Sequence, residues 1–140
     1  MKNKTTFTTP VARILYVEDN QLMAAAAKMT FKSLHCQIDI VGSMAAAFEK
    51  LDEPFHLAIL DLGLPDGDGL TIAKFIRKYP GAISSIPIVM LTAHGDEAQK
   101  ETAFQIGCNG FLQKPLSTEL CEKMLQRFVF AYDETYFMEN

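Results

Sequence analysis

Residues 12–19 read ARILYVED, an apolar run that ends abruptly in two acidic residues. The run is rich in residues that favour β-strands and shows no polar face. A strand that is apolar on both faces is typical of a parallel sheet, because helices cover both sides of such a sheet. The stretch therefore predicts a buried parallel strand over 12–17, followed at once by a pair of carboxylates.

Four more runs of the same kind follow along the chain, and helical patterns separate them. The runs are CQIDIV (36–41), HLAIL (56–60), IPIVML (86–91) and GFLQ (110–113). Helices are predicted over 21–34, 44–51, 72–79, 96–107 and from a candidate N-cap at Ser117 to Phe128. This strict alternation predicts an α/β fold, a doubly wound five-stranded parallel sheet with helices on both faces.

The composition is that of one globular domain. The chain has 140 residues, of which 49% are apolar and 21% charged, and these values exclude intrinsic disorder. With 13 basic and 17 acidic residues the net charge is −4, which argues against a nucleic-acid-binding protein. No apolar run reaches the ~18 residues of a membrane span, and the N-terminus lacks the apolar core of a signal peptide. We therefore expect a cytoplasmic protein that does not enter a membrane.

The pattern along the chain divides it into three parts. Residues 1–11 predict a flexible arm, residues 12–131 the folded domain, and residues 132–140 an aromatic-rich tail. The cysteines are Cys36, Cys108 and Cys121. Their odd number and wide spacing predict buried thiols in a reducing compartment rather than disulfides.

The residues that follow the predicted strands are the informative set, because ligands bind at the carboxyl ends of the strands in such sheets. They are Glu18, Asp19, Asp61, Thr92 and Lys114. Clustered carboxylates repel one another unless a cation joins them, and hard oxygen ligands suit Mg²⁺. A hydroxyl and an ammonium suit an incoming phosphoryl group, and a carboxylate can itself be the nucleophile. The pattern therefore predicts Mg²⁺-dependent phosphoryl chemistry on one of these acids.

These residues stand in stretches that resemble the receiver domain of two-component response regulators, in particular the stand-alone, chemotaxis-regulator type. The stretches are VEDN after the first strand, LDLGLPDGDG after the third, LTAH after the fourth and FLQKP around the fifth. They occur in the order and at the spacing of that family, and the resemblance covers about residues 12–130. It implies the flavodoxin-like (βα)5 receiver fold.

The resemblance also implies a role for each acid. Asp61 would be the phosphoacceptor. Asp19 and Asp61 would bind Mg²⁺, with the backbone carbonyl of Gly63 as a third protein ligand. Glu18 would hold the metal through water, and it stands where the family more often has the shorter Asp.

Further roles follow for the residues after the fourth strand and around the fifth. Thr92 would hydrogen-bond the phosphoryl oxygen, and Lys114 would contact the phosphoryl group and precede a cis bond to Pro115. Phe111 lies where the family has an aromatic switch residue, and it lacks the hydroxyl of the frequent Tyr. Gly63 and His94 occupy positions thought to tune the lifetime of the phosphoryl group.

The function that the resemblance implies is that of a receiver in a phosphorelay. It would take a phosphoryl group from a histidine kinase or phosphotransfer protein, catalyse its own phosphorylation and dephosphorylation, and change its affinity for an output protein. Only 26 residues follow Lys114. The protein is thus expected to be a single-domain regulator, a phosphorelay intermediate or a receiver cut from a hybrid kinase.

Two alternatives belong to other classes of function. A Mg²⁺-dependent phosphohydrolase would want a second Asp two residues after Asp61, where Gly63 stands. A pure interaction module with this fold would not need the intact set of Asp19, Asp61, Thr92 and Lys114. The sequence 66–69, DGDG, hints at a calcium loop but lacks its spaced ligands, so a tight turn before a helix is the preferred interpretation.

Aromatic residues crowd the end of the chain. They are Phe128, Phe130, Tyr132, Tyr136 and Phe137. One helical face can bury only some of them, so residues 96–137 are a candidate surface for a homodimer or for target docking. The alternative is that the tail folds back over the core of its own domain.

Overall fold

The computed structural model describes residues 12–95, 97–130 and 137–139. The predicted arm at 1–11 and most of the predicted tail therefore lie outside the described residues. No helix in the described part of the chain is long and apolar enough to cross a membrane.

The five predicted strands form one parallel sheet, as expected. They are β1 (Ala12–Val17), β2 (Cys36–Val41), β3 (Leu57–Asp61), β6 (Ile88–Thr92) and β7 (Gly110–Gln113). They lie in the order β2-β1-β3-β6-β7. The run that begins at Ile86 enters the sheet two residues late, because Ile86 closes the short 3₁₀ helix η1 (Ala82–Ser85) and Pro87 has no N–H to donate.

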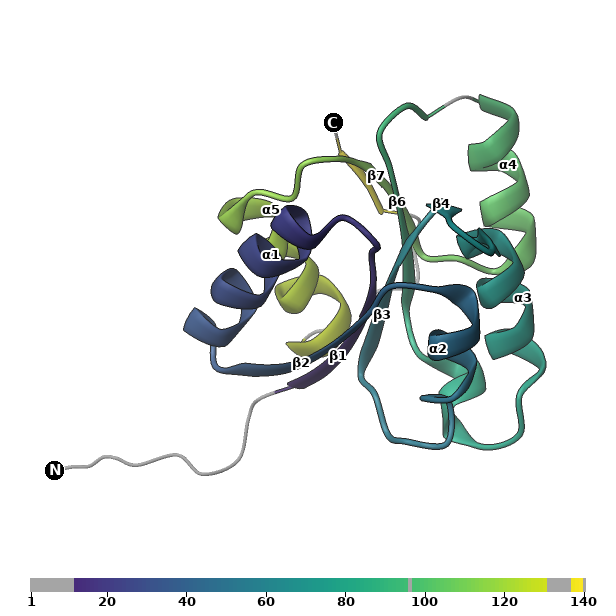
Figure 1. The fold of residues 1–140 in the computed structure, drawn as a ribbon, viewed down its shortest axis with the longest axis horizontal. Coiled ribbons are helices and arrows are strands. Elements are labelled where there is room, and N and C mark those ends of the chain that lie inside the picture. The colour runs from purple at the N-terminus through teal and green to yellow at the C-terminus, as the bar shows by residue number, and fades with distance from the viewer. Residues whose placement is uncertain (1–11, 96, 131–136, 140) are drawn as a thin grey trace, which may run out of the picture.

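Five helices connect the strands and cover both faces of the sheet (Figure 1). They are α1 (Gln21–Ser33), α2 (Met44–Phe48), α3 (Gly69–Lys78), α4 (Glu97–Ile106) and α5 (Thr118–Leu125). Helices α1 and α5 lie on one face, and α2, α3 and α4 lie on the other. Ser117 is the N-cap of α5, as predicted, and accepts a hydrogen bond from the Leu120 amide at 3.0 Å. The doubly wound α/β prediction is thus confirmed.

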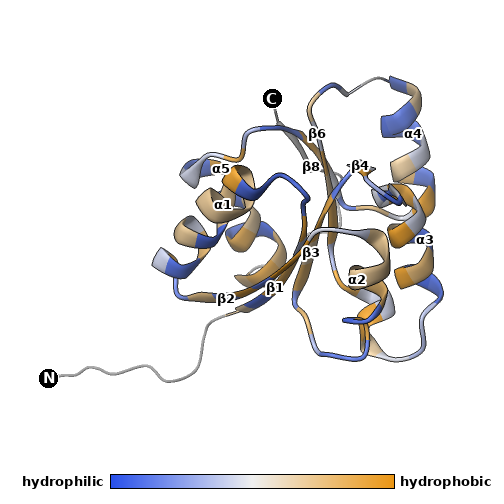
Figure 2. Ribbon diagram, in the orientation of Figure 1, coloured by the Kyte–Doolittle hydropathy of each residue, from blue (hydrophilic) through white to orange (hydrophobic). Residues whose placement is uncertain are grey.

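Each strand contributes alternate side chains to two separate cores. On β1, Leu15 and Val17 pack with the α2, α3 and α4 side, whereas Ile14 and Tyr16 pack with the α1 and α5 side. Figure 2 shows the apolar strands in the centre, with the polar residues of the helices turned outward. All five residues of β3 are buried, as expected for a central parallel strand.

Three of the helices differ from their predicted extent by two residues or more, and α3 begins at Gly69 rather than at Ile72, because Asp68 caps it there. Helix α2 ends at Phe48, although the apolar period continues to Leu51, and Leu51 is buried from the turn that follows. After Leu125 the chain continues as one π-helical turn, η2 (Gln126–Phe130). This turn places Phe128 in the core, as the periodicity requires, and leaves Phe130 54% exposed.

A sixth strand, β8 (Phe137–Glu139), extends the sheet and was not predicted. It pairs with β7 in parallel, with Phe137 opposite Gly110 and Glu139 opposite Leu112. The end of the chain therefore returns to the domain through its backbone. Tyr132 and Tyr136, which belong to the predicted docking surface, lie outside the described residues.

Candidate functional site

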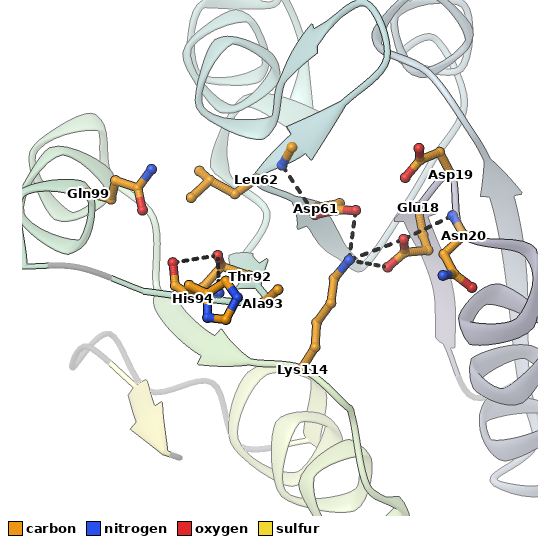
Figure 3. Close-up of a pocket in the computed structure, with 11 residues that line it drawn as sticks. Glu18, Asp19, Asn20, Asp61, Leu62, Thr92, Ala93, His94, Gln99 and Lys114 are labelled. Atoms are coloured by element: carbon orange, nitrogen blue, oxygen red, sulfur yellow. Dashed lines mark hydrogen bonds and ion pairs between the residues drawn. The ribbon is translucent and has the colours of Figure 1, made fainter.

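The residues predicted at the strand ends meet in one pocket at the carboxyl edge of the sheet (Figure 3). They are Glu18 and Asp19 after β1, Asp61 at the end of β3, Thr92 at the end of β6 and Lys114 after β7. Gly63 and His94 line the same pocket. The parallel topology explains the meeting, because every strand delivers its last residue to the same edge.

Lys114 joins two of the carboxylates. Its Nζ lies 2.9 Å from Oδ2 of Asp61 and 3.0 Å from Oε1 of Glu18. The side chains of Glu18, Asp61 and Lys114 are only 0%, 6% and 15% exposed. Burial alone would lower the pKa of Lys114, but its hydrogen bonds to Asp61 and Glu18 outweigh burial and raise that pKa. The lysine is therefore a fixed cation against the carboxylate predicted to be the nucleophile.

The acids exceed the cation in number. Carboxylate oxygens of Glu18, Asp19 and Asp61 all lie within 4.8 Å of one another. Burial raises the pKa of Glu18, the Asn20 amide and Lys114 oppose that shift, and nearby Asp61 adds to it. Three carboxylates thus share the pocket with one lysine, a formal surplus of two acids. Hard oxygen ligands with that surplus suit a divalent cation such as Mg²⁺, so the residues present fit the metal.

Gly63 lies beside the acids in a short hairpin. Strands β4 (Gly63–Leu64) and β5 (Gly67–Asp68) form this hairpin directly after β3. The Gly63 amide donates to Oδ1 of Asp61 at 3.2 Å. The role of its carbonyl as a metal ligand stays a prediction. Gly69 closes the loop: a Cβ there would lie 2.4 Å from the carbonyl oxygen of Asp61, so only glycine lets α3 begin so close to the site.

Thr92 lies on the strand that borders Asp61 on the side opposite Glu18. Its Oγ1 donates to the carbonyl oxygen of His94 at 3.1 Å and accepts from the His94 amide at 3.2 Å. Helix α4 begins only at Glu97, so this hydroxyl does not cap it. It holds the loop after β6 and faces the pocket.

Phe111 is buried below this loop. A Cβ on Gly95 would lie 3.3 Å from Cγ2 of Thr92 and 3.6 Å from the tip of the Phe111 ring, so threonine and ring flank the same glycine. The peptide bond between Lys114 and Pro115 is cis, as predicted. The geometry shows Phe111 in the inward position; that it moves stays a prediction.

The remaining sequence candidates have structural roles. Asp68 caps α3, with its carboxylate accepting from the Thr71 amide at 2.8 Å, and the hairpin confirms the predicted turn. His35 and His56 each lie one residue before a strand. All three cysteines are free and buried, and burial raises the pKa of Cys108 to about 12.

Two pocket residues were missed by the sequence analysis. The backbone amide of Asn20 donates to Oε2 of Glu18 at 3.1 Å, while its side chain caps α1. That role could have been found, since Asn is a preferred N-cap before an Ala-rich helix. Gln99 reaches the pocket from the first turn of α4, and no local pattern marks it.

The chain is similar in sequence to known histidine kinases and transcriptional regulators. A hybrid signal transduction histidine kinase from Dictyostelium discoideum is 30% identical over 86% of the chain, which spans 5% of that protein. The transcriptional regulatory protein GltR from Pseudomonas aeruginosa is 34% identical over 74% of the chain, which spans 43% of it. The chain thus corresponds to only part of these relatives.

A solved structure adds a metal to the comparison. It is the receiver domain of a sensor histidine kinase from Pseudomonas aeruginosa, described with a magnesium ion coordinated in its active-site cleft. It is 26% identical, with a TM-score of 0.77 over 86% of this chain and 98% of that one. The model of the response regulator receiver domain matches residues 14–126, which run from within β1 to the end of α5 and include the residues of the acidic pocket. The chain belongs to the response regulator receiver domain family.

Proposed function

We propose that the chain accepts a phosphoryl group on Asp61 and thereby switches its affinity for a partner. The observation that carries the proposal is the contact of Lys114 Nζ with Asp61 Oδ2 at 2.9 Å, beside two further carboxylates. A lysine held there lowers the repulsion that a phosphoryl group meets when it approaches an anionic nucleophile. The surplus of carboxylates over lysine in the same pocket favours the binding of a divalent cation.

Mg²⁺ would be held by the carboxylates of Asp19 and Asp61, by Glu18 through water and by the carbonyl of Gly63. When bound, the ion neutralises charge on the transferring phosphoryl oxygens. In the relative described with magnesium the ion lies in the active-site cleft, which supports the assignment for this chain.

The transfer is a displacement at phosphorus. A carboxylate oxygen of Asp61 forms the new P–O bond while the P–N bond of a phosphohistidine breaks, and the released imidazole takes up a proton. Lys114 keeps its contact with the transferred group. The Thr92 hydroxyl, now bonded to the His94 backbone, exchanges that partner for a phosphoryl oxygen. Gly95 and Phe111 lie beside Thr92, so a movement of Thr92 would be felt by the Phe111 ring.

The donor would be a histidine kinase or a histidine phosphotransfer protein, and hybrid histidine kinases are among the relatives. The setting would be the cytoplasm. Self-association or target docking through residues 96–137 stays part of the proposal, with β7, α4 and α5 as its described elements.

A hydrolase acting on small phosphate esters is less well supported. Such an enzyme needs a general acid near the nucleophile, and the position two residues after Asp61 is Gly63, with open space around its Cα. Turnover of a small phosphate ester would revive that alternative.

Intact-mass spectrometry after incubation with acetyl phosphate tests the proposal. One phosphoryl group should be added in the presence of Mg²⁺ and none after chelation. The assignment would be wrong if Asp61→Asn gained the same mass, or if the wild-type protein gained a phosphoryl group in the presence of a chelator.

A further inference from the structure

The hairpin that carries Gly63 is anchored at two ends by different elements. Its base is tied to the sheet and to α3: the Leu62 amide donates to Leu91 O at 2.8 Å, and the Gly69 amide donates to Leu62 O at 3.1 Å. The tip, at Asp66, lies away from these bonds. Something else must fix the tip if Gly63 is to keep one position.

Asp66 ties the tip to α2. One carboxylate oxygen accepts from the Met44 amide at 2.7 Å and the other from the Ala45 amide at 3.0 Å. These two backbone bonds lower the pKa of Asp66. The side chain of Ser43, the local N-cap of α2, accepts from the Ala46 amide at 3.1 Å. The first two amides of the helix are therefore satisfied by a residue more than twenty positions away in the sequence.

The hairpin and α2 are also in close contact. A Cβ on Gly67 would lie 2.6 Å from Sδ and 2.7 Å from Cε of Met44, so the backbone of the tip touches the first side chain of the helix. Gly63, in contrast, has no such contact: a Cβ there would meet nothing within 4 Å. The bonds that hold Gly63 are its pairing with Asp68 in the hairpin and its amide bond to Asp61, so its position depends on that of the hairpin.

We propose that Asp66 is a positioning residue for the acidic pocket, because its two bonds to α2 hold the hairpin that places Gly63 beside Asp61. Gly63 transmits the constraint directly, since its amide donates to Oδ1 of Asp61. Without Asp66 the base of the hairpin would stay bonded to the sheet and to α3, but its tip would no longer be bonded to α2. The consequence for Mg²⁺ rests on the proposed function; the consequence for the hairpin does not.

The test compares Asp66→Ala with Ser43→Ala. Both remove side-chain acceptors from the same helix end, but only Asp66 lies on the hairpin, so Ser43→Ala is the matched control for a weakened α2. In the metal-free protein, backbone ¹⁵N relaxation should give order parameters of about 0.85 at Gly63 and Leu64 in wild type and in Ser43→Ala. Asp66→Ala should lower them to below about 0.6. Asp66→Asn, which keeps one acceptor, should lie between.

Mg²⁺ titration followed by calorimetry is the second measurement. Asp66→Ala should bind Mg²⁺ on the order of tenfold more weakly than wild type, and Ser43→Ala should not differ from wild type. Unchanged order parameters in Asp66→Ala overturn the inference, and so does an unchanged Mg²⁺ affinity. An equal loss in Ser43→Ala overturns it as well, since α2 itself would then be the cause. Failure of wild type to bind Mg²⁺ would refute the proposed function, and the order parameters would still decide the role of Asp66.

Discussion

The molecule holds two clusters of charged side chains at opposite ends of β1, and they are built differently. In one, Arg13 and Lys50 meet Asp39 and Glu53. Arg13 contacts Asp39 with two nitrogens, at 2.8 and 3.2 Å, and also bonds Glu53. Lys50 Nζ completes the cluster at 3.0 Å from Asp39. Two cations face two carboxylates, so the charges balance.

The pocket cluster is unbalanced. Lys114 faces Glu18, Asp19 and Asp61, so three acids share the pocket with one cation. The balanced cluster lowers the pKa of Asp39 to about 2, chiefly through the Arg13 hydrogen bond, whereas burial raises the pKa of Glu18. A cluster with matched charges needs no further ion, whereas a cluster with surplus carboxylates suits a bound cation. The contrast is consistent with the proposal that the pocket cluster is the functional site.

Exchanging one acid in each cluster should separate the two roles most clearly. Asp61→Asn should abolish phosphorylation by acetyl phosphate and leave stability unchanged or improved, because it relieves repulsion. Asp39→Asn should keep phosphorylation and lower the free energy of unfolding by about 1–3 kcal/mol, because it weakens hydrogen bonds to charged partners. Intact-mass spectrometry and urea unfolding measure both effects. Similar behaviour of the two variants would remove the distinction between the clusters.

The two lysines offer a second comparison. Lys114→Ala should slow phosphorylation about a hundredfold, since it removes a cation from the reacting group. Lys114→Arg should restore only part of the rate, because a planar fork replaces a compact charge. Lys50→Ala is the control and should react at the wild-type rate. Large loss of structure in Lys114→Ala by circular dichroism would instead indicate that this lysine holds the fold.

Thr92→Ala tests an uncharged residue of the same pocket. It should retain the fold and lower the yield or lifetime of the phosphorylated form about tenfold, the value of one lost hydrogen bond. The measurement is the decay of the phosphorylated mass after the donor is removed. If the phosphorylated form of this variant decays at the wild-type rate, Thr92 only holds the backbone of His94 and does not act on the phosphoryl group.

Metal should stabilise only one cluster. At about 100 times its dissociation constant, Mg²⁺ should add about 2.7 kcal/mol to the free energy of unfolding of wild type. Asp39→Asn should gain the same increment, and Asp19→Asn should gain little of it. Thermal unfolding with Mg²⁺ and with a chelator distinguishes the cases. Equal gains in all three proteins would place the metal elsewhere.

Acid should act on the balanced cluster. The pKa of Asp39 is lowered in the folded state, so its contribution is complete above the ordinary value of 3.8 and is lost as the pH falls toward about 2. Wild type should therefore lose about 2 kcal/mol more than Asp39→Asn over this range. Glu18 has the opposite sign, because its pKa is raised in the folded state. The free energy of unfolding should therefore fall as the pH rises from the unfolded pKa of Glu18 through its folded pKa. Glu18→Gln should reduce this dependence of stability on pH. Parallel pH curves for wild type and both variants would contradict the assignment.

The strands and the pocket could be predicted because the apolar runs end on the residues that line the pocket. Leu60 is followed by Asp61 and Leu91 by Thr92, so strand boundary and site share one signal. Strand β8 carries no such signal, since three residues at the end of an aromatic stretch show neither alternation nor a turn.

Contacts between segments that are distant in the sequence could not be predicted, for a different reason. The bonds from Asp66 to Met44 and Ala45 depend on where the chain folds, and DGDG alone indicates only a turn. The balanced cluster is similar, because Arg13 and Glu53 are 40 residues apart. Local patterns predict elements and their ends, and tertiary hydrogen bonds need the structure.

The most direct test of the account is to locate the phosphoryl group. Borohydride reduces an aspartyl phosphate to homoserine, which peptide mass spectrometry then places in the sequence. After incubation with acetyl phosphate and Mg²⁺, we predict homoserine at position 61 alone, with Glu18, Asp19 and Asp39 unchanged. Homoserine at another aspartate, or none despite a gain in intact mass, would contradict the claim that the unbalanced cluster is a phosphoacceptor site.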